Sequence, residues 1–544
     1  MIRATTSPIS ARWLALLALA FVLPGLFGHD PWKSVDAIGV EIAHQMHLRG
    51  DWLVPRVAGE PWLDSPPLFF WLSAALARLG ALYLPFHDAA RIASGVCVLA
   101  ACAFLYRAGR LSAAPADAGG ATTAAAVLLL PGSIGLMVHA HEAATELGAL
   151  AACAAALALL PYRTGLAAAR PLLGGAGYGA ALGVAFLSTG PVTAAALLLA
   201  LLAAIAVCDT WRTVRHLRFA AAAVVVFTAC ALSWPLALRA HSPELFDIWW
   251  SHAARTRAPA GQSLGYLLEV SAWFLWPAWP LALWALWTRR AALRAPEVFA
   301  PLAAALLLLA GQALSGARQD VALLVLLPPV ALLASLGVPA LRRGAAASLD
   351  WFAVMCFSFF AALVWLGYVA MLSGWPPKVA NNFAKTAPGF AASFEWPTFA
   401  LALALALAWG GLAFRMPPSP ARGVTRWAAG VTLLWGSFAA LWLPWADHQK
   451  SYRPVALQLK SRLPPGEACV SGHNLGTPQR AALSYHAGLR PQDDQQGRCA
   501  FLLVQGSPQQ ESVPPVSGRR WVKLADVGRP GDKAERFRLY RLER

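Results

Sequence analysis

Long apolar runs follow one another over most of this 544-residue chain. A helix needs about 20 apolar residues to cross a bilayer, and a chain made of such runs has few other ways to fold. Hydrophobic residues make up 58% of the sequence and charged residues only 13%. These values exclude a water-soluble multi-domain protein and predict an all-α polytopic membrane protein.

The apolar runs predict about 13 transmembrane helices. We place them near residues 12–28, 92–106, 120–138, 143–161, 171–187, 190–207, 219–238, 271–288, 298–315, 321–340, 351–372, 397–414 and 427–445. The run at 66–85 begins with two prolines and lacks a basic anchor after it, so we interpret it as an interfacial helix. No A-x-A-like cleavage site follows the first run, which favours an uncleaved span over a signal peptide.

Arginine clusters between the runs orient the spans. If 66–85 does not cross, every cluster falls on the side of Arg3 and Arg12, which the positive-inside rule makes cytoplasmic. The clusters are Arg107/Arg110, Arg163/Arg170, Arg212/Arg215/Arg218, Arg289/Arg290/Arg294, Arg342/Arg343 and Arg415/Arg422/Arg426. We therefore expect a multi-pass protein of the bacterial inner membrane with a cytoplasmic N-terminus and a periplasmic C-terminus. The net charge of +17 then reflects orientation, not nucleic-acid binding.

The composition divides the chain into two domains, a transmembrane part at 1–446, with a first external loop at 29–91, and a polar part at 447–544. In the polar part, "SYRPVALQLKSRL" and "TPQRAALSYHAGL" have helical spacing, whereas "CAFLLVQG", "RWVKLADVG" and "RFRLYRLE" are typical of strands. We expect a small C-terminal α/β domain on the outer face. Its Cys469 and Cys499 form a disulfide if the domain is periplasmic, or else remain two free thiols.

Acidic residues gather in the first external loop, directly after the first apolar run. Asp30 and Asp36 come with Lys33 and Arg56 among several tryptophans and phenylalanines. Solvent exposure alone would explain one isolated acid in an external loop. A mixed-charge aromatic surface at headgroup depth instead suits an amphiphilic lipid that bears a phosphate.

Several motifs occur in a consistent order. They are "DPWKSVDA…HQMHLRGDWLVPRVAGEPWLDSPPLFFWL", "FHDAARIAS", "FLSTGPV" and "LSGARQDVALLVLLPPVALL". Together they resemble the first external loop and later segments of bacterial membrane glycosyltransferases of the C type, the group that contains lipid A aminoarabinose transferases and protein O-mannosyltransferases. The resemblance covers roughly residues 12–340, and 13 spans plus a C-terminal periplasmic domain match the aminoarabinose-transferase architecture.

The resemblance implies transfer of a sugar from an undecaprenyl (polyprenyl) phosphate donor to lipid A or another periplasmic acceptor. An acid in the first loop would accept the proton of the acceptor, and basic side chains would hold the donor phosphate. Asp36 stands at the second position of the family's acidic pair and is the expected base, with Asp30 in reserve. Glu142 occupies about the position of a further family acid at the top of the fourth span.

Two lysines of the family pattern are absent. Ser65, preceded by Asp64, stands where E-K-P-P has its lysine, and Thr189 stands where K-G-P has its lysine. Val35 also replaces the first acid of the acidic pair. The expected phosphate contacts are then Lys33, Arg56, Arg255, Arg257 and Arg318. The alternative is a non-catalytic or weakened relative that binds lipid-linked sugar.

The sequence "HAHEAATE" raises the question of a metal. His139, His141 and Glu142 lie within four residues, but their spacing does not define a complete set of metal ligands. A hydrated helix end is therefore favoured over a metal site. No cofactor is expected, and a divalent metal stays an alternative.

Glu146 lies one turn after Glu142 and faces the same side. In "FDIWWSHAARTR", Arg255 and Arg257 either clamp a ligand or belong to an interfacial helix, and His252 is expected at the surface.

Overall fold

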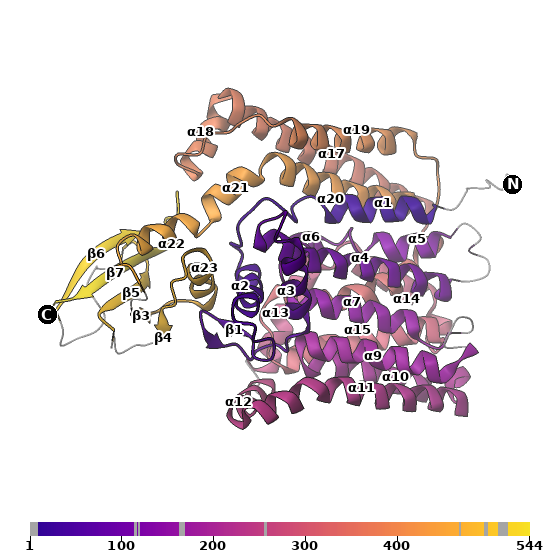
Figure 1. The fold of residues 1–544 in the computed structure, drawn as a ribbon. Helices are drawn as coiled ribbons and strands as arrows, with labels where there is room; N and C mark the ends of the chain where they lie inside the picture. The colour runs from indigo at the N-terminus through magenta and orange to yellow at the C-terminus, as the bar shows by residue number, and fades with distance from the viewer. Residues whose placement is uncertain are drawn as a thin grey trace.

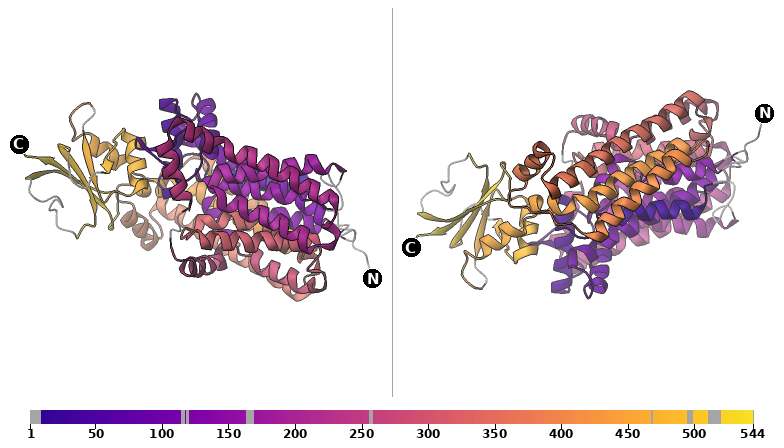
Figure 2. Two further views of the ribbon diagram at one scale, coloured as in Figure 1. Left: turned by 90° about the horizontal axis from the view of Figure 1, so that it is seen from below. Right: turned by 90° about the horizontal axis from the view of Figure 1, so that it is seen from above.

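The computed structural model describes residues 9–113, 117, 120–162, 169–254, 258–466, 469–493, 499–509 and 520–543. Most helices run along one common axis and form an elongated bundle, and a β-sheet projects from one end of it (Figure 1). Two views from below and above show the same arrangement, with the sheet beyond the bundle in both (Figure 2). The element α1 begins at the end of the bundle opposite to the sheet.

The first half of the chain supplies one side of the bundle and an external segment. Its long elements are α1 (Ala11–Val22), α4 (Phe86–Ser112), α5 (Ala121–Leu128), α6 (Ile134–His139), α7 (Thr145–Leu159), α9 (Pro171–Thr189), α10 (Pro191–Val207) and α11 (Val214–His241), with a 3-10 turn at Asp209–Trp211. Between α1 and α4 lie α2 (Ser34–Arg49), the antiparallel pair β1 (Arg56–Val57) and β2 (Glu60–Pro61), and α3 (Leu68–Gly80). These four elements form the external cap of the bundle.

The second half of the chain completes the bundle. It contains α12 (Pro243–Ala254), α13 (Ala260–Phe274), α14 (Ala278–Thr288), α15 (Pro296–Leu314), the 3-10 helix η3 (Asp320–Leu326), α16 (Leu327–Ser335), α17 (Arg343–Ser373), α18 (Pro377–Thr386), α19 (Trp396–Arg415), α20 (Arg422–Leu441) and α21 (Leu443–Lys450), with short 3-10 turns at Arg290–Ala292 and Val338–Ala340. The most extensive contacts between helices join α9 with α11 and α17 with α20.

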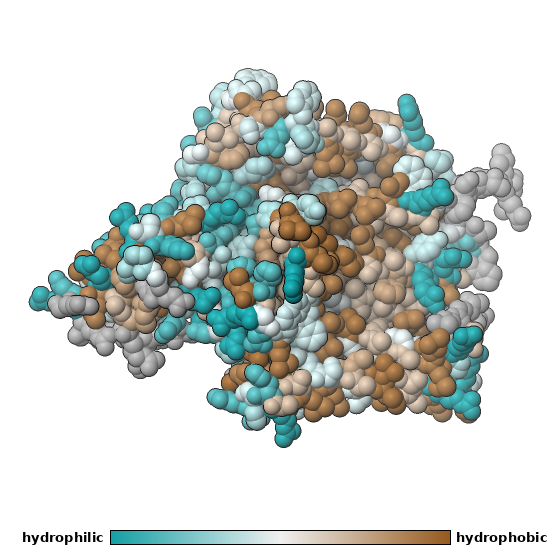
Figure 3. Space-filling view, viewed as in Figure 1, coloured by the Kyte–Doolittle hydropathy of each residue, from teal (hydrophilic) through white to brown (hydrophobic). Residues whose placement is uncertain are grey.

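Among the described residues, seven helical stretches are long and apolar enough to cross a membrane, and the bent stretch from α20 into the next helices adds an eighth if it counts as one span. Further apolar helices, including α1, α7 and α10, are shorter than 18 residues. Hydrophobic side chains cover the visible face of the bundle, and hydrophilic ones gather toward its two ends (Figure 3). This banded surface is the one expected of a protein that sits across a bilayer.

Three of the expected spans are each broken into two helices, and the one at 427–445 bends by 65° where α20 ends and α21 begins. The predicted span at 120–138 is α5 and α6, separated by a turn that contains Pro131, and the predicted span at 271–288 joins the end of α13 to α14 across Pro277. Proline has no backbone N–H and interrupts a helix, so the breaks at Pro131 and Pro277 follow from the sequence. The expected loop at 239–270 is mostly helical, because it contains α12 and the first part of α13.

The apolar run at 66–85 forms only the 13-residue helix α3. This is well short of the roughly 20 residues that a crossing helix needs. Its Phe69 and Phe70 are buried in the main core, and the helix packs along α4.

The C-terminal part combines helices with a mixed five-stranded sheet. The sheet order is β4-β3-β5-β7-β6, in which β3 pairs in parallel with β4 and β5 and the other pairs are antiparallel. Its elements are α22 (Arg453–Lys460), β3 (Val470–His473), α23 (Thr477–Ala487), β4 (Gln492–Asp493), β5 (Phe501–Gly506), β6 (Trp521–Val527) and β7 (Arg536–Leu542). Both helices and the three longest strands form where the sequence pattern predicts them. Cys469 and Cys499 form a disulfide with a Cα–Cα distance of 5.2 Å.

Candidate functional site

A cavity of about 300 Å³ lies where three connections between helices meet. The first is the segment before α3, with Asp64 and Ser65; the second is the turn from α9 to α10, with Thr189; the third is the turn from α15 to η3, with Arg318. Helix α12 and the start of α7 complete the wall through Trp249, His252 and Glu146. The cavity therefore unites segments that lie more than 250 residues apart in the sequence.

Local sequence explains how the second and third connections turn. Gly190 has φ +87° between the end of α9 and Pro191, the first residue of α10. Gly316, two residues before Arg318, has φ +75°. Only glycine adopts such angles without strain, and proline favours the first helical position, so each connection reverses sharply and presents its polar residue to the cavity. The Thr189 hydroxyl lies 3.2 Å from that of Thr193 across the first of these turns.

Among the described residues that line the cavity, Arg318 is the only arginine or lysine. Its side chain is exposed, and its guanidinium donates to the side-chain oxygen of Gln262 on α13. No carboxylate lies within ion-pair distance of it in the described part of the chain. A guanidinium placed in this way can bind an oxyanion with two parallel hydrogen bonds.

Two carboxylates line the same cavity. Asp64 accepts a hydrogen bond at 3.2 Å from Nδ1 of His252, which belongs to α12. Glu146 stands in the first turn of α7 and accepts a hydrogen bond of 3.2 Å from the Thr145 hydroxyl. Among the described residues, no cationic side chain pairs with Glu146. One arginine and two carboxylates therefore line the same cavity, and group transfer from a phosphate uses both kinds of group.

Behind the cavity, Glu142 anchors a chain of charged side chains. Lys33 Nζ lies 2.6 Å from Glu142 Oε1, and His139 Nδ1 lies 3.1 Å from Oε2 of the same carboxylate. The other ring nitrogen of His139 lies 3.4 Å from the carboxylate of Asp320, whose neighbours Gln319 and Val321 line the cavity. The chain Lys33, Glu142, His139 and Asp320 thus links the turn after α6 to the third connection.

Burial and neighbouring charges have opposite effects on the pKa values of Glu142 and His139. Burial alone would raise the pKa of Glu142, but Lys33 and His139 hold it below its usual value. For His139, burial acts to lower the pKa, but hydrogen bonds to Asp320 and Glu142 raise it to about 9. These contacts therefore favour the charged forms of Glu142 and His139.

Asp36, the expected base, does not line the cavity. It is buried in α2 and forms an ion pair with Arg91 of α4, with a distance of 2.7 Å between Oδ2 and the guanidinium. Its Oδ1 accepts a hydrogen bond of 2.8 Å from the backbone N–H of Ala143. Although burial opposes its charge, Arg91 holds the pKa of Asp36 below its usual value. Both oxygens are engaged within the protein, so this geometry places Asp36 as a support for the turn that carries Glu142.

Asp30, the reserve base, contacts the C-terminal domain. It accepts a hydrogen bond of 2.6 Å from the Ser451 hydroxyl and pairs with Arg453, and its own N–H donates to Asp447 at 2.8 Å. Burial acts to raise the pKa of Asp30, but Ser451 and Arg453, together with the charge of His486, hold it below its usual value. The carboxylate therefore fastens the first external loop to the segment that leads into the sheet.

The residues expected to bind substrate divide into three groups. Asp64, Ser65, Thr189 and Arg318 line the cavity together, as the motifs predict. Lys33 lies behind it, and Arg56 pairs with Asp51 at 3.5 Å outside the cavity lining. Arg255 and Arg257 lie outside the described residues, directly after the α12 residues of the cavity wall.

Three residues around the cavity were not in the expected set. His252 was expected at the surface, yet its position one turn before Arg255 in an aromatic helix was a usable signal. Glu146 was noted only for its spacing from Glu142. Nothing in the sequence around Gln262 indicates its contact with Arg318, because the two residues are 56 positions apart.

The His139 and His141 side chains separate in space. His139 joins the charged chain, whereas His141 stacks on Trp435 of α20 with ring centroids 4.5 Å apart. Within the described residues, no group of three or more His, Cys, Asp or Glu side chains is arranged to hold a metal ion.

No family model matches the chain. A relative from Pseudomonas fluorescens, named undecaprenyl phosphate-alpha-4-amino-4-deoxy-L-arabinose arabinosyl transferase 2, is 29% identical over 270 residues. The match covers 48% of the chain and 44% of the relative, so the chain spans less than half of that protein's length. The crystal structure of ArnT from Cupriavidus metallidurans bound to undecaprenyl phosphate matches with a TM-score of 0.71, at 19% identity, over 98% of both chains.

The chain has the fold of this ArnT. The same ArnT in the apo state gives a TM-score of 0.66 at 18% identity, over 97% of this chain and 98% of that one. The four motif positions around the cavity belong to segments that carry the resemblance seen in the sequence, namely Asp64, Ser65, Thr189 and Arg318.

Proposed function

We propose that the protein transfers a sugar from an undecaprenyl (polyprenyl) phosphate donor to lipid A or another periplasmic acceptor. One observation carries this proposal, namely that three motif segments far apart in the sequence meet around one cavity that contains an unpaired arginine. The fold supports it, since the matched ArnT structure is bound to undecaprenyl phosphate.

The donor phosphate would bind to Arg318. The guanidinium supplies the positive charge, and the hydroxyls of Ser65 and Thr189 supply hydrogen-bond donors where the family pattern has lysines. The cavity volume of about 300 Å³ suits a sugar phosphate headgroup and leaves the polyprenyl chain in the bilayer. Arg255 and Arg257 follow the cavity wall in sequence and remain predicted phosphate contacts.

Glu146 is the best placed base. It lines the cavity and lacks a cationic partner among the described residues, whereas both oxygens of Asp36 are occupied. The acceptor oxygen attacks the anomeric carbon, the bond from that carbon to the phosphate oxygen breaks, and the phosphate leaves with the electron pair. The acceptor proton passes to the Glu146 carboxylate. A single inverting displacement needs only one such base. Asp36, Glu142 and Lys33 are then positioning residues, and Asp30 holds the C-terminal domain.

The membrane topology forms part of the proposal. We infer 13 spans, a cytoplasmic N-terminus and a periplasmic domain at 447–544. The start of α1 and the C-terminal sheet lie at opposite ends of the bundle, which supports an odd number of crossings (Figure 1). The disulfide between Cys469 and Cys499 supports a location in the oxidising periplasm.

A second function has one specific observation in its favour. Ser65 and Thr189 place neutral hydroxyls in the cavity at the two positions where the family pattern has lysine. A protein with this lining could hold a lipid-linked sugar without transferring it. The donor site would then act in binding alone.

The test compares binding and transfer in one preparation. Full-length protein in phospholipid nanodiscs is given an undecaprenyl phosphate-linked aminosugar, and donor binding and transfer to lipid A are measured side by side. Binding with transfer supports the enzyme; binding without transfer to any acceptor supports the binding protein. Neither binding nor transfer would contradict both. Mass spectrometry of lipid A and periplasmic glycoconjugates from a deletion strain identifies the natural acceptor.

A further inference from the structure

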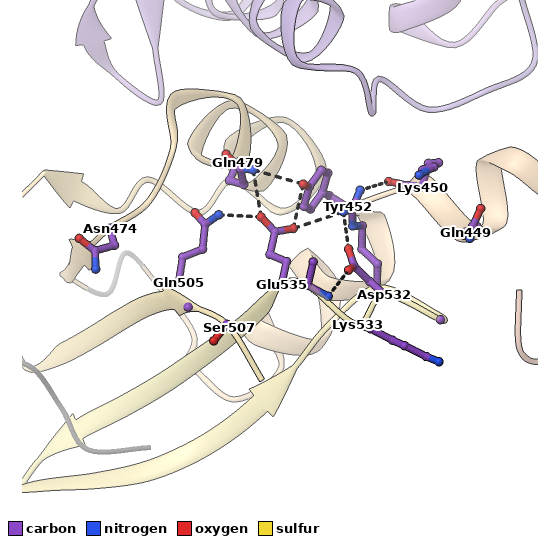
Figure 4. Close-up of a pocket in the computed structure, with 14 residues that line it drawn as sticks. Gln449, Lys450, Tyr452, Asn474, Gln479, Gln505, Ser507, Asp532, Lys533 and Glu535 are labelled. Atoms are coloured by element: carbon purple, nitrogen blue, oxygen red, sulfur yellow. Dashed lines mark hydrogen bonds and ion pairs between the residues drawn. The ribbon is translucent and has the colours of Figure 1, made fainter. Parts of the chain in front are cut away.

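A second, larger cavity of about 850 Å³ lies on the C-terminal domain. It is enclosed by the end of α21, the start of α22, α23, the end of β5 and the connection from β6 to β7 (Figure 4). It shares no lining residue with the cavity at Arg318. Nothing in the proposed transfer reaction uses it.

The floor of this C-terminal cavity is a preorganised hydrogen-bond cluster around Glu535. Its carboxylate accepts hydrogen bonds from the Tyr452 hydroxyl at 2.9 Å, Gln479 at 3.0 Å and Gln505 at 2.6 Å (Figure 4). Arg529 pairs with Asp532 and lies over the Tyr452 ring, 4.5 Å from its centroid. These side chains come from four separate elements, and their mutual bonds hold the cavity open without a ligand.

The rim adds positive charge that nothing in the cavity neutralises. Lys450 and Lys533 line the cavity and are exposed, and neither forms an ion pair with another described residue. The two acids of the lining are already engaged, Asp532 by Arg529 and Glu535 by its three donors. The lining therefore combines two ammonium groups with carboxamide side chains and has an excess of positive charge.

The lining excludes a lipid chain and fits a sugar. Apart from Ala534 and the Tyr452 ring, which Arg529 covers, the cavity offers no apolar side chain. Carboxamides such as Asn474, Gln479 and Gln505 both donate and accept hydrogen bonds, which is what adjacent sugar hydroxyls need. The volume lies within the range of small-molecule sites and holds more than one sugar ring.

The cavity is also fixed relative to the membrane domain. Its wall at Gly531 packs on the C-terminal end of α18 so closely that a Cβ there would lie 2.3 Å from the Thr386 carbonyl oxygen. A ligand in this cavity would thus sit at a constant place beyond the outer end of the bundle.

We propose that the C-terminal cavity binds the anionic saccharide portion of the acceptor, a phosphorylated or otherwise acidic sugar, and so orients the acceptor toward the cavity at Arg318. The identification of this saccharide as part of the acceptor rests on the proposed function. The recognition of an anionic saccharide rests on the lining itself.

Calorimetry on the full-length protein in detergent tests the site without any transfer. The probe is a bis-phosphorylated glucosamine disaccharide without acyl chains, compared with the same disaccharide without phosphates and with inorganic phosphate. We expect saturable binding of the phosphorylated disaccharide, and a dissociation constant raised about tenfold or more by the double variant Lys450→Ala/Lys533→Ala. Lys460→Ala, an exposed lysine of α22 outside the cavity, is the matched control and should bind as wild type.

Three results would overturn the site: no saturable binding, equal binding by the double variant, or equal binding of the unphosphorylated disaccharide. Because both lysines are exposed, an unchanged melting temperature is expected for the double variant, and Gln505→Leu gives a second test of the floor.

In a transfer assay the double variant should raise the acceptor KM and leave kcat unchanged. Binding without transfer would reject the proposed function alone, whereas transfer with an unchanged acceptor KM would reject this inference alone.

Discussion

Asp36 of α2 and Arg91 of α4 form an ion pair at 2.7 Å in which neither side chain has more than 1% of its surface exposed. A second bond joins Asp36 to the N–H of Ala143, so one carboxylate ties together α2, α4 and the turn after α6. In this geometry, both carboxylate oxygens of the predicted base are engaged by groups of the protein itself.

Replacing Asp36 by asparagine should therefore destabilise the protein. The change removes the closer of the two carboxylates that pair with the buried Arg91, the other being Asp88 at 3.2 Å, and breaking a buried pair costs up to about 3–5 kcal/mol. Thermal unfolding in detergent should show a lower apparent melting temperature. If Asp36→Asn melted like wild type and yet transferred no sugar, Asp36 would act in the reaction itself and our assignment of the base would fail.

Glu146→Gln should affect the chemical step. Loss of a general base lowers kcat by about 10²–10⁴-fold, and the amide is too similar in size to disturb the cavity. Donor binding, measured by calorimetry, should stay as in wild type. Asp64→Asn is the matched comparison, since it alters the other carboxylate of the cavity; a larger loss of kcat in that variant would move the role of base to Asp64.

The cavity at Arg318 was largely predictable from the sequence, because short motifs with glycine and proline fix the local turns. The positions of Asp64, Ser65, Thr189 and Arg318 followed from these motifs. The roles of Asp36 and Asp30 did not. Their partners lie 55 and more than 400 residues away, and no local pattern encodes such pairings.

The fold, like the site, was predicted only in part. Long apolar runs indicated the bundle, and alternating patterns indicated the strands of the C-terminal sheet. The breaks at Pro131 and Pro277 were missed because hydropathy averaged over a span ignores the missing N–H of one proline. The start of α13 at Ala260 was missed because polar residues precede its apolar part.

The charged chain at His139 should make stability depend on pH. The pKa of about 9 in the folded protein lies above the usual histidine pKa of 6.5. The charged ring therefore stabilises the protein fully below about pH 6.5, and this contribution is lost as pH rises through 9. His139→Gln cannot titrate. The melting temperature of wild type should exceed that of His139→Gln at pH 6, and the gap should narrow toward pH 10. A gap that stays constant across this range would show that His139 is neutral in the folded protein.

Asp30 should matter more to the docking of the C-terminal domain than its partner Arg453. The Asp30 side chain is only 9% exposed, whereas that of Arg453 is 51% exposed. Asp30→Ala leaves the Ser451 hydroxyl without its acceptor, but an exposed ion pair alone contributes at most about 1 kcal/mol. Limited proteolysis should cut Asp30→Ala faster around residues 447–453 than Arg453→Ala. Equal cutting of both variants would mean that the ion pair alone holds the domain.

Donor binding by Arg318→Ala tests the central claim most directly. Wild-type protein and the variant are titrated with undecaprenyl phosphate in nanodiscs, with Arg56→Ala as an arginine outside the cavity. Loss of a charge-assisted contact of about 1.5–3 kcal/mol should weaken binding by Arg318→Ala at least tenfold, and Arg56→Ala should bind as wild type. Wild-type affinity in Arg318→Ala would contradict the placement of the donor phosphate in this cavity.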